Sequence, residues 1–328
     1  MRKNLFLIVG VVILLSFQGC VQSTQPKQLE TVYLYSALLG EPKLSVTPDY
    51  VYYSSPVDGS KQYYAILLPD NFSPENAYDL VVFLHGFGAD ERSGFEVFAD
   101  YAQENGVILV STPYNSHVPY AYAALDGKAG DAQSYMNANA VKDLEWVVAA
   151  LKQKFRVQKF ILVGHSMGGG GSLVFAQQAS PEVKPDGVLA FLPWTNGFLA
   201  YNQIKQQNLF SKVKGLPEKF NQDLWRTVEV SLNGGNPMTE KDWAPISPLY
   251  NFDKIRRDSM VVLVGAEGDG LLPPTQHVVP LQKELAAAGM RVEGFNIPGN
   301  HSQATISQPG EKYNVASELL DKLRKDLG

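Results

Sequence analysis

Continuous apolar runs of similar length recur along most of the chain. They lie at 79–86, 106–113, 159–166, 187–194 and 259–267. Short runs without polar alternation are typical of strands that are buried on both faces of a parallel sheet. We therefore predict a central sheet whose strands are covered by helices on both sides.

Amphipathic stretches separate these runs. In the clearest, 137–155, apolar residues recur every three or four positions and form one stripe, which predicts a helix that packs on the sheet. The stripe consists of Val141, Leu144, Val148, Leu151 and Phe155. Further helices are predicted at 92–105, 275–288 and 312–326, and further strands at 50–55, 62–69 and 291–298.

The alternation of strands and helices predicts an α/β fold with a mostly parallel, doubly wound sheet. Residues 49–328 have the length of one such domain. The segment at about 198–245 interrupts the pattern with mixed signals. It leaves a strand at the carboxyl end, where ligands bind in such sheets, so we expect an insertion that forms a cap beside the site. A surface insertion without contact to substrate is the alternative.

The sequence GHSMGGGG at 164–171 follows directly from one of the predicted buried strands. Its spacing Gly-x-Ser-x-Gly is that of the nucleophile elbow, a sharp strand-to-helix turn that exposes a serine above the sheet. Each glycine at a helix start costs about 1 kcal/mol relative to alanine, which indicates a steric or functional need for it. The glycine patterns of phosphate loops and dinucleotide sites do not fit. Ser166 is therefore the candidate nucleophile.

A serine nucleophile needs a base and an acid that orients the base. Where these follow in the order Ser, acid, His, only His277 and His301 can supply the base. His301 follows the last predicted strand and is the candidate; His277 lies near a helix start and suits a structural or pocket-rim role. Asp269, which follows the strand at 259–267, is the candidate acid, and Glu267 is its rival.

Two backbone N–H groups are expected to form an oxyanion hole. One belongs to Met167, the residue after the nucleophile. The second comes from the loop HGFG at 85–88, where Phe87 is the expected donor. His85 is expected to brace this loop rather than to react.

The N-terminus has the pattern of an export signal. Two basic residues precede an apolar run at 5–17, which is shorter than the roughly 20 residues that span a bilayer. The run leads to Cys20, the only cysteine, and resembles the lipobox of bacterial lipoproteins. We expect a signal peptide at 1–19, lipidation of Cys20, and a tether and N-terminal extension at 20–48. A cleaved signal with an incidental cysteine is the alternative.

These features imply a location in the cell envelope, with a lipid anchor as the contact to the membrane. Val21 stands where many lipoproteins that stay in the inner membrane carry an aspartate, so the resemblance favours the outer membrane or cell surface. The net charge is −5, and no cluster of lysine and arginine stands out. We therefore expect no nucleic-acid partner.

The combination of motifs resembles the α/β-hydrolase superfamily over residues 50–327, and most of all bacterial esterases of the dienelactone-hydrolase, cutinase and polyester-hydrolase type. It rests on the glycine-rich elbow, on Pro193-Trp194 after the next strand, and on the acid loop from Gly265 to His277. In polyester hydrolases an aromatic residue of the oxyanion loop and the tryptophan hold the substrate ring. The resemblance implies these substrate-binding roles for Phe87 and Trp194.

This chain departs from that group in two respects: it lacks the cysteines for the disulfides common there, and it has a long insertion after Trp194. The HGFG loop and WAPISPLYNFDKI at 243–255 look more like feruloyl or acetyl esterases and peptidase-like hydrolases.

Together these patterns predict a lipid-anchored serine hydrolase that cleaves small-molecule or polymeric carboxylic esters, with short or aromatic acyl groups preferred. We expect no cofactor and no metal, because Glu267 and Asp269 alone are a poor cation site. A peptidase or amidase with the same three residues is one alternative. A catalytically inactive surface lipoprotein that binds a ligand is the other.

Overall fold

The computed structural model describes residues 46–86, 89–113, 136–207, 229, 236–302, 305–307 and 314–328. The predicted signal peptide, Cys20 and nearly all of the tether lie outside these residues, as does most of the predicted cap, and they stay predictions. Among the described residues, no helix is long and apolar enough to cross a membrane.

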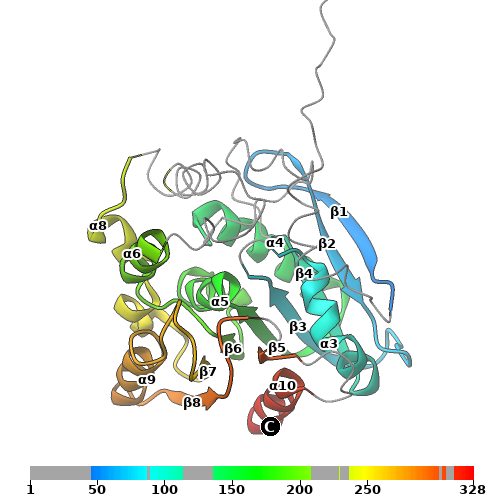
Figure 1. The fold of residues 1–328 in the computed structure, drawn as a ribbon. Coiled ribbons are helices and arrows are strands. Elements are labelled where there is room, and N and C mark those ends of the chain that lie inside the picture. The colour runs from blue at the N-terminus through cyan, green and yellow to red at the C-terminus, as the bar shows by residue number, and fades with distance from the viewer. Residues whose placement is uncertain are drawn as a thin grey trace, which may run out of the picture.

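The described strands form one sheet in the order β1-β2-β4-β3-β5-β6-β7-β8 (Figure 1). β1 pairs antiparallel with β2, β2 pairs antiparallel with β4, and all other neighbours are parallel. The strands are β1 (Asp49–Ser54), β2 (Lys61–Leu67), β3 (Ala77–Leu84), β4 (Val107–Thr112), β5 (Arg156–His165), β6 (Gly187–Phe191), β7 (Met260–Ala266) and β8 (Arg291–Ile297). The predicted fold class is therefore confirmed.

Helices cover both faces of this sheet (Figure 1). The helices are α3 (Arg92–Glu104), α4 (Ala138–Lys154), α5 (Met167–Gln178), α6 (Gly197–Gln207), α8 (Glu240–Trp243), α9 (Val278–Ala287) and α10 (Val315–Asp326). Apolar residues of α3 and α10 pack on one face of the sheet, and those of α4, α5 and α9 pack on the other.

Strand β3 illustrates how the apolar runs produce these two layers. Val81 and Phe83 lie in the core on the α3 and α10 side, whereas Leu80, Val82 and Leu84 lie in the core on the α4 and α5 side. Because successive side chains of a strand point to opposite faces, a strand between two helical layers must be apolar throughout.

The predicted elements agree with the observed ones, with local differences at their ends. The run at 187–194 ends as a strand at Phe191, because Leu192 has a φ of 47° and its N–H bonds to the carbonyl of Val264 on β7. The predicted helix at 137–155 is α4, which begins after Asn137. The side chain of Asn137 accepts a hydrogen bond from the N–H of Ala140 and caps the helix.

This arrangement puts the candidate site at the carboxyl ends of the parallel strands. β5, β6, β7 and β8 run parallel, so the loops after them emerge along the same edge. These loops carry Ser166, Trp194, Asp269 and His301. The predicted insertion leaves the sheet from the same edge. Its first described part is α6, which follows β6, and its last part includes α8, which precedes β7.

Candidate active site

Ser166 occupies a strained turn between β5 and α5. Its backbone has φ 56° and ψ −112°, a conformation that residues with a side chain rarely adopt. Its N–H donates to the carbonyl of Phe191 on β6 at 2.8 Å, and its carbonyl accepts from the N–H of Gly170 at 3.1 Å. The strand on one side and the helix on the other therefore hold the turn.

Three glycines around Ser166 are required by close backbone approach. A Cβ on Gly164 would overlap the carbonyl of Gly168, and a Cβ on Gly168 would overlap the carbonyl of Leu84 at the end of β3. A Cβ on Gly169 would lie 2.6 Å from the carbonyl oxygen of Phe191. Helix α5 thus begins pressed against the ends of β3 and β6.

The last two glycines of the run differ from each other. A Cβ on Gly170 would overlap the indole ring of Trp194. A Cβ on Gly171 would meet its nearest neighbours, atoms of Met136, at 3.5 Å, an ordinary van der Waals distance. Gly171 therefore has no steric need to be glycine.

The structure brings Ser166, His301 and Asp269 together. Ser166 Oγ lies 2.7 Å from Nε2 of His301, and Nδ1 of His301 lies 2.7 Å from Oδ2 of Asp269. An aspartate oxygen can only accept, so Nδ1 carries the proton and Nε2 is free to accept from the serine hydroxyl. This is the arrangement in which an imidazole can remove a proton from a hydroxyl.

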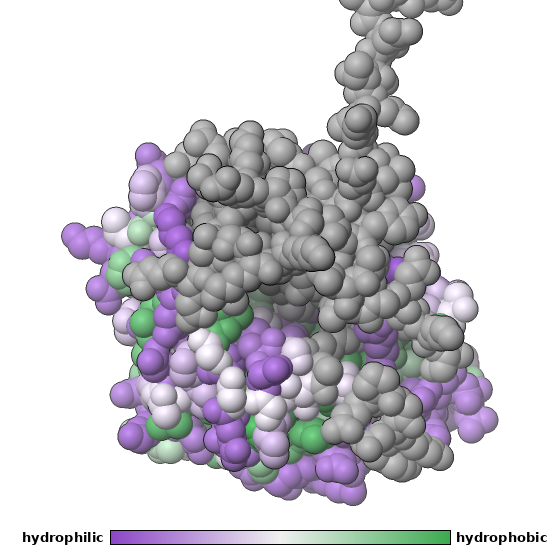
Figure 2. All heavy atoms as spheres, viewed as in Figure 1, coloured by the Kyte–Doolittle hydropathy of each residue, from purple (hydrophilic) through white to green (hydrophobic). Residues whose placement is uncertain are grey.

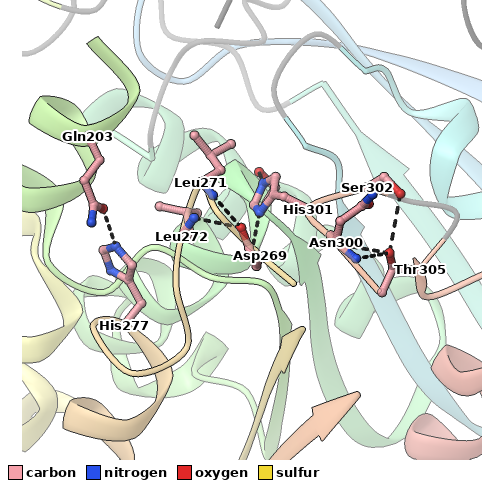
Figure 3. A network of polar contacts seen from close by, with 10 residues as sticks. Gln203, Asp269, Leu271, Leu272, His277, Asn300, His301, Ser302 and Thr305 are labelled. Carbon is pink, nitrogen blue, oxygen red and sulfur yellow. Dashed lines mark hydrogen bonds and ion pairs between the residues drawn. The ribbon is translucent and has the colours of Figure 1, made fainter. Parts of the chain in front are cut away.

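Asp269 is held as a carboxylate by its surroundings (Figure 3). Its side chain is fully buried, and its Oδ1 accepts from the N–H groups of Leu271 at 2.9 Å and Leu272 at 2.8 Å. Burial alone would raise the pKa of Asp269, but the hydrogen bond and charge of His301 and the two N–H donors outweigh it and hold this pKa below its ordinary value.

The rival residues lie elsewhere. Glu267 is exposed and keeps only its main chain in the site, where its N–H bonds to the carbonyl of Ile297. His277 is fully buried at the end of the acid loop, and the hydrogen bonds of its ring go to Thr195 and Gln203. Asp269 and His301 are therefore the members of each pair that the structure places in line with the nucleophile.

The structure describes one of the two residues expected to form the oxyanion hole. Met167 opens α5, and the N–H groups of a first helical turn have no partner within the helix. Phe87 lies outside the described residues, so its N–H stays a prediction. Its neighbour Gly86 packs against the nucleophile, since a Cβ there would lie 3.4 Å from Cβ of Ser166. His85 is buried, and its Nδ1 lies 2.8 Å from the carbonyl of Gly86.

Trp194 does not have the position that the resemblance implied. Its side chain is only 1% exposed, and it packs in the core edge-on against Trp243. Its indole N–H donates to the carbonyl of Met167 at 3.1 Å. A ring buried in this way packs against the first turn of α5, so this position gives no support to the substrate clamp that the resemblance implies for Trp194.

A buried polar network behind the acid loop was not predicted from the sequence. The N–H of Thr195 donates to Nδ1 of His277 at 3.3 Å, and the Thr195 hydroxyl donates to the His277 carbonyl at 2.7 Å. Nε2 of His277 therefore carries the proton and donates to Oε1 of Gln203 on α6 at 3.0 Å (Figure 3). Burial lowers the pKa of His277 to about 4.

His165 also lies at the site without a role in the sequence-based prediction. It is buried next to Ser166, with its ring 6.0 Å from that of His301. Burial lowers its pKa to about 3, with a further contribution from the charge of His301. A neutral ring here leaves His301 free to take up a proton without a second positive charge beside it. Among the described residues, no group of three or more potential metal ligands occurs.

The two glycines of α5 give a matched pair of variants. Gly170→Ala should destabilise the protein by about 1–3 kcal/mol or more and lower activity, because the new methyl group displaces the Trp194 ring. Gly171→Ala should raise stability by up to about 1 kcal/mol, since alanine favours the helix and has room. Denaturant unfolding of both variants tests this. Equal losses in the two variants would contradict the assignment of Trp194 as the obstacle.

Stability should depend on pH through His277. Its pKa is about 4 in the folded protein and about 6.5 when unfolded. Between these values only the unfolded chain binds the proton, so this contribution is fully present above about pH 6.5 and is lost as pH falls towards 4. The loss amounts to about 3 kcal/mol.

Unfolding of the parent protein and His277→Gln at pH 7, 5.5 and 4 measures this contribution. The stability difference between the two should shrink as the pH falls. Leu281→Ala is the control, because it removes a buried apolar side chain on the neighbouring helix and titrates nothing. A difference for His277→Gln that stays constant with pH, as for the control, would show that His277 does not titrate as described.

The fold is shared with solved structures of low sequence identity. A thermostable esterase from Pseudomonas putida is 19% identical, with a TM-score of 0.59 over 90% of this chain and 86% of that one. An esterase from Pyrococcus furiosus is 16% identical, with a TM-score of 0.60 over 87% of this chain and 95% of that one. At such identities the likeness shows the fold alone.

Peptidases share the fold over a smaller part of their length. An acylaminoacyl peptidase from Pyrococcus horikoshii is 13% identical, with a TM-score of 0.60 over 89% of this chain. This chain matches 43% of that peptidase, and 35% of a protein from Bacteroides ovatus described as a "putative dipeptidyl aminopeptidase IV".

Curated proteins gave no match to the sequence. A protein-family model does match, over residues 55–288, and its description is "Putative esterase". The matched region runs from the end of β1 to the end of α9 and includes Ser166 and Asp269. Since it covers more than half of the chain, the protein belongs to this esterase family.

Proposed function

We propose that the protein hydrolyses carboxylic esters through a covalent acyl-enzyme. The observation that carries this proposal is the continuous hydrogen-bonded line from Ser166 Oγ through His301 to the buried Asp269. Membership of an esterase family supports the choice of substrate bond.

In the first half-reaction Ser166 Oγ attacks the carbonyl carbon of the ester, and His301 Nε2 takes the hydroxyl proton. Asp269 keeps the Nδ1–H tautomer of His301 and stabilises the imidazolium that forms. The tetrahedral intermediate collapses, the alkoxide leaves with the proton from His301, and the acyl group stays on Ser166.

In the second half-reaction water replaces the alcohol. His301 removes a proton from the water, which attacks the acyl-enzyme, and the same proton returns to Ser166 as the acid is released. The N–H of Met167 and the predicted N–H of Phe87 would bind the oxyanion in both steps. Each such donor contributes about 3 kcal/mol in the transition state.

Replacement of the nucleophile tests this mechanism. Ser166→Ala should lower kcat for a nitrophenyl ester by at least about 10³-fold and abolish labelling by a fluorophosphonate probe. Ser172→Ala removes a buried hydroxyl further along α5, and this variant should keep both the parent kcat and the labelling by the probe. A Ser166→Ala variant that still takes up the probe would remove Ser166 as nucleophile. Matched ester and amide substrates then distinguish an esterase from an amidase.

We further infer a preference for short acyl groups over long ones. Support comes from the insertion, whose sequence carries too many charged residues to form a continuous apolar surface. These residues are Lys205, Lys212, Lys214, Glu218 and Lys219. In the view of Figure 2, the described part of the surface is mainly hydrophilic, with scattered hydrophobic residues. The buried position of Trp194 removes the earlier argument for an aromatic clamp from that side.

A series of acyl esters with one leaving group tests the preference. Acetyl and butyryl esters should have higher kcat/KM than the palmitoyl ester, because long chains need an extended apolar surface. A feruloyl ester measures whether an aromatic acyl group is accepted without Trp194. The highest kcat/KM for palmitoyl would overturn the preference and indicate that apolar residues of the insertion line the pocket.

A further inference from the structure

Among the described residues of the loop that carries His301, the side chain of Thr305 bonds back to Asn300, the residue before the histidine (Figure 3). Thr305 Oγ1 donates to the carbonyl of Asn300 at 2.8 Å and accepts from the N–H of the same residue at 3.2 Å. One hydroxyl therefore bonds both the main-chain N–H and the main-chain carbonyl of Asn300, the residue directly before His301. Ser302 Oγ lies 3.4 Å from this hydroxyl, a weaker contact.

His301 is the centre of a tight turn at this point. The N–H of Ser302 donates to the carbonyl of Asn300 at 2.9 Å, which closes a three-residue turn around His301. The Asn300 carbonyl thus accepts from both Ser302 and Thr305. Any rotation of the His301 backbone would have to break these bonds.

The chain makes room for Thr305 at a specific residue. Gly299 has a φ of 120°, which favours glycine, and a Cβ on it would lie 2.7 Å from Cγ2 of Thr305. The carbonyl of Gly299 accepts from the N–H of Gly268 at 2.8 Å. Gly268 precedes Asp269, so the same short segment joins the loop of the base to the loop of the acid.

These contacts have a consequence for the reaction. The bond from Ser166 Oγ to His301 Nε2 and the bond from His301 Nδ1 to Asp269 Oδ2 both depend on where the imidazole lies. A displacement of about 1 Å in such a group can lower a rate by about 10²-fold. The contacts described for the Thr305 hydroxyl are to the main chain of Asn300 and to Ser302 Oγ, and none of them is to Ser166 or Asp269.

We propose that Thr305 is a positioning residue that sets the imidazole of His301 for proton transfer, through its two hydrogen bonds to Asn300. The proposal rests on the serine-hydrolase function proposed above. It assigns to Thr305 an effect on the chemical step rather than on substrate binding or on global stability.

Substitutions that separate the hydroxyl from the shape of the side chain test this role. Thr305→Val keeps the shape and removes both hydrogen bonds, and should lower kcat by about 10- to 100-fold with KM changed by no more than about 2-fold. Thr305→Ser keeps the hydroxyl and should retain kcat within about 3-fold of the parent. Ser302→Ala removes only the 3.4 Å contact to this hydroxyl and leaves the two bonds between Thr305 and Asn300, so it should retain kcat within about 3-fold of the parent.

A double-mutant cycle decides whether the effect passes through His301. In a His301→Ala background, Thr305→Val should cause no further loss in the hydrolysis rate, because the residue through which it acts is gone. A further loss as large as that in the parent background would overturn the proposal. So would a Thr305→Val enzyme with the kcat of the parent, or a Thr305→Ser enzyme as slow as Thr305→Val.

Thr305→Cys covers the case in which the valine variant fails to fold, since a thiol is a weak donor of similar size. Its kcat should lie between those of the serine and valine variants, and a kcat equal to that of the parent would overturn the proposal.

Fluorophosphonate labelling separates this test from that of the proposed function. If the parent protein itself is not labelled at Ser166, the serine-hydrolase function fails and Thr305 has no imidazole to position. If the parent is labelled and Thr305→Val is labelled at the same rate, the function stands and only the role of Thr305 is overturned. A labelling rate reduced in parallel with kcat supports it.

Discussion

The close approach of α5 to the ends of β3 and β6 is the constraint on which the rest of the site depends. Gly164 and Gly168 leave no space for a Cβ between the turn and the carbonyl groups around it. This contact fixes the direction in which Ser166 leaves the sheet, and it forces the backbone of that residue into a strained conformation. The stability of the parallel sheet, with both faces buried, compensates for this strain.

The acid and the base are placed by a different means. β7 and β8 are neighbours, and main-chain hydrogen bonds continue between the loops that follow them, from Glu267 to Ile297 and from Gly268 to Gly299. The distance between Asp269 and His301 is therefore set by the pairing of β7 with β8, which continues into these loops. Ser166 follows β5, so β6 and β7 lie between its strand and β8, and the loops after β5 and β8 span this distance to bring Ser166 and His301 into contact. Sheet register and loop length together bring the three residues into line.

Features that depend on a local pattern of residues, such as the strands and the candidate catalytic residues, could be predicted from the sequence. Apolar runs identified the strands, and the order Ser, acid, His along a parallel sheet was enough to select Ser166, Asp269 and His301 as candidates that the fold places in contact. The choice between Asp269 and Glu267 could be made in the same way, because the two differ in their distance from the strand end.

Contacts between distant segments were beyond such reasoning. The position of Trp194 depends on the space left by Gly170, and a motif does not reveal to which side a ring turns. Thr305 can bond to Asn300 because Gly299 has no side chain in its way, and no pattern of residue types predicts this contact. The network of Thr195, His277 and Gln203 joins three separate segments, which the order of residues alone does not bring together.

The location of β8 has a consequence for how the protein responds to heat. Among the described strands, β8 is the last of the sheet and has a partner on one side only; its residues are half-buried or exposed, whereas those of β7 are fully buried. Local opening in proteins begins in segments of this kind, at free energies below that of global unfolding. The base follows directly from this edge strand, and the nucleophile follows from a central one. We therefore expect fraying of the sheet margin to separate His301 from an intact elbow, so that the proposed ester hydrolysis is lost at a lower temperature than the fold.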